Sequence, residues 1–88
     1  MRAARQYLQT MPFSFKGLVK QLKFEGYSTS DATYGASHSG ANWMAQAVNA
    51  ARQYLQTMPF SFRSMVEQLQ FDGFTHAQAV HGARAAHL

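Results

Sequence analysis

Three lysines in the N-terminal half of the chain recur at helical spacing. Lys16, Lys20 and Lys23 stand four and three residues apart, which places their side chains on one face of a helix. The N-terminal half holds five basic and two acidic residues, a net charge of +3, whereas the C-terminal half holds three and two, a net charge of +1. Such a stripe, with Arg63 as a further candidate contact, would steer an acidic partner toward the chain. It favours an acidic protein, a nucleic acid or an anionic surface, and a solvated lysine face is the alternative.

The remaining chemistry-bearing residues form neither a metal-site pattern nor a catalytic one. Four histidines are present: His38, His76, His81 and His87. The last three are five and six residues apart, whereas a helix chelates a metal through residues three or four apart. The four acidic residues lie near predicted helix ends, and the chain has no cysteine nucleophile and no Gly-rich phosphate loop. We therefore predict no enzyme, no metal site and no cofactor.

A duplicated stretch organises the whole chain. AARQYLQTMPFSF occurs at 3–15 and again at 50–62, an offset of 47 residues, and the match continues at the same offset to Gly26 and Gly73. A period of this length is typical of stacked supersecondary units. Each unit is near or below the size at which a chain buries a sufficient core, so the two units are expected to share apolar surface.

Each repeat predicts three helices, within units that span 1–38 and 42–88. In the second unit Asn42 is a favourable N-cap for a long helix that starts at Trp43 and ends just before Pro59. The first unit lacks the segment that would match this start, so its first helix should be about two turns shorter. The predicted fold class is all-α, a tandem repeat of two three-helix, helix-turn-helix-like units.

Caps and stops at matching positions delimit the shorter helices. A serine or threonine before each helix predicts an N-cap, and a glycine after the second helix predicts a left-handed stop. These structural residues are Ser14 and Ser61, Ser28 and Thr75, and Gly26 and Gly73.

The aromatic residues are predicted to form the core. Trp43 is the expected anchor, which packs its helix against either its own third helix or the first unit. Tyr7 and Tyr54 can leave their hydroxyls at the surface, and Phe13 and Phe60 precede the cap serines as hydrophobic staples. The other predicted core aromatics are Phe15, Phe24, Tyr27, Tyr34, Phe62, Phe71 and Phe74.

A helix-turn-helix DNA-binding module of a regulator is the alternative function. The second and third helices of each unit are joined by a short glycine turn, as that motif requires. Reading bases needs long polar side chains on the third helix, but the first unit offers only serine, threonine and aspartate there. The second unit offers Gln78 and Arg84. A protein is therefore the favoured partner over nucleic acid.

Taken in order, these elements resemble the Ltp family, the host cell surface-exposed lipoprotein domain. The second unit shows Asn42-Trp43, Tyr54-Leu55, Met58-Pro59-Phe60-Ser61, Met65-Val66-Glu67-Gln68-Leu69, Gly73-Phe74-Thr75 and Ala79. The first unit shows Tyr7-Leu8, Met11-Pro12-Phe13-Ser14, Gly17-Leu18-Val19-Lys20-Gln21-Leu22, Gly26-Tyr27-Ser28 and Ala32. Ser64 stands where the family pattern has a glycine, which the first unit keeps as Gly17.

The resemblance implies an all-helical module that is tethered outside a Gram-positive cell by a lipid anchor lying beyond these residues. Phage or prophage-encoded members of the family are associated with superinfection exclusion, in which the entry of incoming phage DNA is blocked. The implied partner is a protein of the injection machinery, such as the tail tape-measure protein. The sequence itself contains no secretory signal and no apolar run of the ~20 residues that a membrane span needs.

Overall fold

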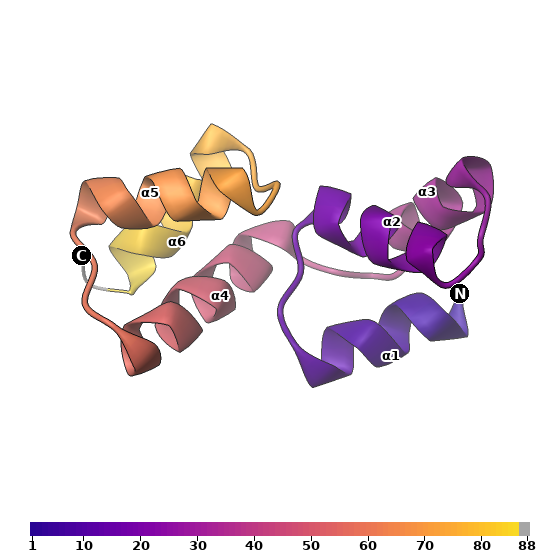
Figure 1. Ribbon diagram of the computed structural model, residues 1–88, viewed down its shortest axis with the longest axis horizontal. Coiled ribbons are helices and arrows are strands. Elements are labelled where there is room, and N and C mark those ends of the chain that lie inside the picture. Colours follow the sequence, from indigo (N-terminus) through magenta and orange to yellow (C-terminus); the bar gives the residue numbers. More distant parts are fainter. Residues whose placement is uncertain (87–88) are drawn as a thin grey trace.

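The computed structural model describes residues 1–86, and every element of that part of the chain is a helix (Figure 1). The helices are α1 (Arg2–Thr10), α2 (Phe15–Phe24), α3 (Thr29–Ser37), α4 (Trp43–Thr57), α5 (Phe62–Phe71) and α6 (His76–Ala85). The all-α prediction is confirmed. Helix α1 has nine residues and α4 has 15, so the expected difference of about two turns is also present.

The predicted caps close the helix starts. The side chains of Ser14, Ser61 and Asn42 accept the backbone N–H of the residue three positions on, over 2.9–3.1 Å, and those of Ser28 and Thr75 do the same. Thr75 and Gln78 form the reciprocal capping box that the sequence indicates. These bonds satisfy backbone donors that have no partner within a helix.

Both second helices end in the same glycine turn. Gly26 and Gly73 have φ values of +112° and +105°, in the region that favours glycine. After Gly73, the N–H of Phe74 donates to the carbonyl of Leu69 over 3.1 Å, which closes a Schellman motif. The turn directs the chain into the third helix of each repeat.

Two clusters of buried side chains form the core. One contains Ala4, Leu18, Leu22, Ala32 and Ala36, from α1, α2 and α3. The other contains Ala47, Ala50, Ala51, Met65, Val66, Leu69, Phe74, Ala79 and Ala83. Small residues permit the closest helix contact, because a Cβ atom on Gly82 of α6 would lie 2.8 Å from the backbone of Ala47 in α4.

Trp43 connects α4 to the core of the first repeat. It is the first residue of α4, but its side chain packs against the cluster of the first repeat, where its ring meets Phe15 edge to face at 5.6 Å between centroids. Of the two contacts that the sequence left open, the structure has the one with the first repeat.

The prediction that all the aromatics belong to the core is wrong for the ends of α2 and α5. Phe24 and Phe71 are 87% exposed, and Tyr34 and Tyr27 are also exposed. Phe24 follows the buried Leu22 by two residues, which is about 200° around a helix, so the two side chains point to opposite faces. The repeat places Phe71 in the same position relative to Leu69.

Substitutions of Leu22 and Phe24 should distinguish a buried position from an exposed one. We expect Leu22→Ala to lower the free energy of unfolding by about 2–5 kcal/mol, because it leaves a cavity at a fully buried position. Phe24→Ala should change it by less than about 0.5 kcal/mol. Urea denaturation followed by circular dichroism measures the free energy of unfolding of both variants. An equal decrease in the two would contradict the burial of Leu22 and the exposure of Phe24.

Candidate functional site

The three lysines surround a shallow groove on α2. The groove has a volume of about 270 Å³ and is lined by Phe15, Lys16, Val19, Lys20, Lys23 and Thr33. The lysines are exposed, whereas Phe15 and Val19 are half-buried and add apolar surface between them. Among residues 1–86 these lysines form no ion pair, so their charge is available to a partner. We call this surface the basic groove.

Arg63 lies apart from the basic groove, on α5. Its Nε atom is 3.3 Å from Oε1 of Glu67, one helical turn further on. At the repeat offset Arg63 corresponds to Lys16 and Glu67 corresponds to Lys20, so the second repeat replaces a lysine by an acid on the same face. An exposed pair of this kind contributes about 0.3–0.5 kcal/mol. Of the four candidate contacts, the three lysines therefore lie together in the basic groove, whereas Arg63 lies on the other repeat.

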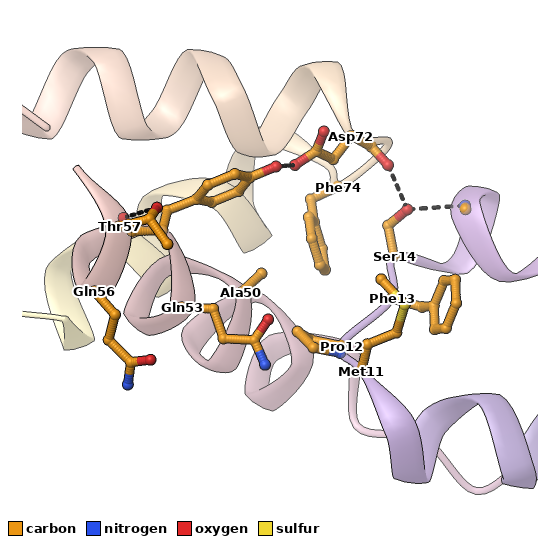
Figure 2. A pocket seen from close by; sticks show the side chains of 12 residues that line it. Met11, Pro12, Phe13, Ser14, Ala50, Gln53, Gln56, Thr57, Asp72 and Phe74 are labelled. Carbon is orange, nitrogen blue, oxygen red and sulfur yellow. Dashed lines mark hydrogen bonds between the residues drawn. The ribbon is translucent and has the colours of Figure 1, made fainter. Parts of the chain in front are cut away.

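A larger cavity of about 590 Å³ lies between the repeats (Figure 2). The segment from Met11 to Ser14 forms one side, and Tyr54 of α4 forms another. Figure 2 shows Phe74 and Pro12 facing each other across the space. Sequence reasoning missed this cavity because its walls come from segments about 40 to 60 residues apart, which only the packing of the repeats brings together.

Asp72 is the centre of a hydrogen-bond network at the edge of this cavity. The hydroxyl of Tyr54 donates to Oδ2 of Asp72 over 2.5 Å. The Nε2 group of Gln68 donates to Oδ1 of Asp72 over 3.1 Å and lies 3.3 Å from the tyrosine oxygen. The network ties the end of α4 to the end of α5.

The first repeat contains the same arrangement. Tyr7 donates to the Glu25 carboxylate, and Nε2 of Gln21 lies 3.4 Å from the Tyr7 oxygen. A tyrosine, a glutamine and an acid are thus kept at one offset of 47 residues. This coincidence was the signal in the sequence that could have revealed the network.

Both tyrosines of these networks have a raised pKa. Burial, together with the hydrogen bond to Asp72 and its charge, raises the pKa of Tyr54 to about 12. The pKa of Tyr7 is also raised, chiefly by its hydrogen bond to Glu25. A tyrosine with the ordinary pKa of about 10 is already protonated at neutral pH, so both hydroxyls are hydrogen-bond donors that hold helix ends together. An upward shift of the pKa is the opposite of the shift that activates a nucleophile.

The two repeats meet where α5 ends and α2 begins. The hydroxyl of Ser14 donates to the backbone carbonyl of Asp72 over 2.7 Å, and Ser14 is 2% exposed. A Cβ atom on Gly73 would lie 2.6 Å from the Ser14 oxygen and 3.0 Å from Cβ of Lys16, so only glycine fits there. Figure 1 shows α5 and α2 nearly end to end. We call this contact the repeat joint.

A second hydrogen bond supports the repeat joint. The N–H of Phe13 donates to Oε1 of Gln46 in α4 over 2.9 Å. This bond and the Trp43 contact hold the loop before α2 against the second repeat. The basic groove therefore begins directly beside the joint, at Lys16.

The described histidines are placed singly. Nδ1 of His38 lies 2.9 Å from the Tyr34 carbonyl, and the two rings stack. Nδ1 of His76 lies 3.2 Å from Oε1 of Gln70. Within residues 1–86 no three residues of the metal-binding types come close enough together to share an ion. His87 lies outside the described residues.

Comparison with known families places the chain. The family model described as host cell surface-exposed lipoprotein matches residues 1–38 and 42–83, which is nearly the whole chain. The chain belongs to this family. Neither the curated proteins nor the solved structures give a match. Its members are described as lipoproteins exposed at the host cell surface.

The unmatched residues between 38 and 42 are the connection between α3 and α4. In the part of the chain that the structure describes, none of the helices of this lipoprotein domain has the length and hydropathy to cross a bilayer.

The tyrosine network predicts a particular dependence of stability on pH. Because the pKa of Tyr54 is about 12 in the folded chain and about 10 in the unfolded chain, the unfolded chain loses its proton first. The stability that this hydroxyl supplies is complete below about pH 10 and is lost as the pH rises toward 12. Tyr54→Phe should therefore lose less stability than the wild type over this interval.

Urea midpoints at a series of pH values measure this difference. Tyr34→Phe is the control, because in the described residues the Tyr34 hydroxyl contacts no carboxylate. The control should follow the wild type. If the urea midpoints of the wild type and of Tyr54→Phe fell equally as the pH rises, the contact between Tyr54 and Asp72 would be absent in solution.

Proposed function

We propose that this lipoprotein domain is a non-enzymatic protein-binding module whose basic groove contacts an acidic segment of another protein. The observation that carries the proposal is the cluster of Lys16, Lys20 and Lys23, which form no ion pair within residues 1–86 and line one groove with half-buried Phe15 and Val19. Unpaired charge steers association, and the apolar surface adds contact area once the partner is seated.

The family suggests what the partner is. Membership in the host cell surface-exposed lipoproteins supports a location outside the cell. By resemblance, the proposed function is superinfection exclusion by a module that is lipid-anchored on a Gram-positive cell. The proposed partner is a phage injection protein, such as the tail tape-measure protein, which the module would bind before the phage DNA enters.

The exposed face of α3 favours a protein over DNA as the partner. In a helix-turn-helix module this helix would read bases, which requires long polar side chains. Its exposed polar residues are Thr29, Ser30, Asp31, Thr33 and Ser37. These side chains are short, and Asp31 would repel phosphate.

Charge reversal in the basic groove tests the proposal. We expect the triple variant Lys16→Glu, Lys20→Glu and Lys23→Glu to reduce phage exclusion by about tenfold or more, because it removes the steering charge. The assay compares plating of the phage on cells that display the wild-type or the variant domain. Circular dichroism checks that the helices are retained.

The matched control reverses three other exposed cations. Arg2→Glu, Arg5→Glu and Arg52→Glu change the net charge equally but lie on α1 and α4, away from the groove. Exclusion should persist in this control. Equal loss in both variants, or exclusion that survives in the groove variant, would contradict the proposal. Salt-sensitive, sequence-selective DNA binding in a gel-shift titration would favour the regulator instead.

A further inference from the structure

The repeat joint uses different faces of the two repeats. The first repeat contributes the start of its second helix, at Ser14 and Gly17, and the second repeat contributes the turn at the end of its second helix, at Asp72 and Gly73. Such a head-to-tail contact is heterologous: the start of α2 is the accepting face, and the glycine turn that ends the second helix is the inserting face. The inserting face of the first repeat is open, since nothing lies within 4 Å of a Cβ atom built on Gly26.

The accepting faces of the two repeats differ in one hydrogen bond. In the first repeat the Ser14 hydroxyl accepts the N–H of Gly17 over 2.9 Å and donates its proton across the joint to Asp72. In the second repeat the Ser61 hydroxyl accepts the N–H of Ser64 over 3.0 Å, but it lies 3.0 Å from the Ser64 hydroxyl.

A serine hydroxyl has a single proton to donate. When Ser61 directs that proton to Ser64, none is left for the carbonyl of a neighbouring repeat. The Ser64 hydroxyl in turn accepts the N–H of Ser61 over 2.9 Å, which completes a capping box. The proton of the Ser61 hydroxyl is therefore used within its own repeat, whereas the Ser14 hydroxyl donates its proton to the neighbouring repeat.

Steric crowding at position 17 also disfavours the joint. A Cβ atom on Gly17 would lie 2.9 Å from the Ser14 oxygen and 3.6 Å from the Asp72 carbonyl oxygen. A side chain here would therefore require the Ser14 hydroxyl, which makes the joint, to shift. A serine at position 17 would also add a hydroxyl oxygen that competes for the proton of the Ser14 hydroxyl.

We propose that the third residue of the second helix decides whether a repeat accepts another repeat. Glycine at this position, as in Gly17, leaves an accepting face whose partner is the helix-ending glycine turn of a further repeat of the same kind. Serine, as in Ser64, closes that face. Within residues 1–86 the second repeat therefore presents no accepting face of this type, and the accepting face of the first repeat is filled by the second repeat.

The test gives the start of α2 the same pair of serines that begins α5. Gly17→Ser recreates the sequence pattern of Ser61 and Ser64, a helix start that the chain already forms, so α2 is expected to fold. Nuclear Overhauser contacts between the α protons of Gly73 and the β protons of Lys16 report the joint in the wild-type chain. We expect these cross-peaks to disappear in Gly17→Ser, while those between Phe74 and Leu69 persist.

Two further variants complete the experiment. Gly17→Ala adds only the Cβ atom, and it favours the helix by up to about 1 kcal/mol, so loss of the joint in this variant cannot come from unfolding of α2. We expect the joint cross-peaks to disappear here as well. Ser64→Gly is the matched control, in which they should remain. Retention of the cross-peaks in either Gly17 variant, or their loss in Ser64→Gly, would overturn the proposal.

Discussion

The hydrogen bond from Ser14 to the Asp72 carbonyl sets the arrangement of the two repeats. Each repeat has only about 40 residues, too few to bury a large core. The largest fully buried side chains are Leu18 and Leu22 in the first repeat and Met65 and Leu69 in the second. Asp72 links its own repeat to the neighbour, because its carboxylate holds Tyr54 while its carbonyl accepts from Ser14. Trp43 adds apolar contact across the same boundary. The boundary between the repeats thus combines a hydrogen bond with an aromatic contact.

This arrangement explains how a duplicated sequence presents different surfaces. The duplicated elements have matching caps, turns and tyrosine networks, so the backbone requirements are the same in both repeats. The charged face of the second helix differs, because lysines in α2 become Arg63 and Glu67 in α5. Placing α5 end to end with α2 puts the exposed Phe71 and Lys16 near the same boundary. The lysines of the basic groove therefore lie on the first repeat and have no matching set on α5.

Local features of the fold could be predicted from the sequence, whereas contacts between the repeats could not. Ser14, Thr75 and Gly73 act through their immediate neighbours, and the structure confirms the roles that their residue types predict. Phe24 was misassigned because hydrophobicity alone does not show that it lies about 200° from Leu22. The cavity and the repeat joint depend on the seating of one repeat against another, and the sequence indicated only that apolar surface is shared. The lysine spacing located the basic groove, but only the structure shows that Arg63 lies apart from it, on α5.

The tumbling of the two repeats in solution tests this account most directly. Nitrogen-15 relaxation gives a rotational correlation time for the amides of α2 and, separately, for those of α5. If the joint holds, both sets fit one common rotational tensor, that of an elongated body of about 37 × 21 × 20 Å. Two shorter and independent correlation times, each typical of a domain of half the size, would contradict a fixed joint between the repeats.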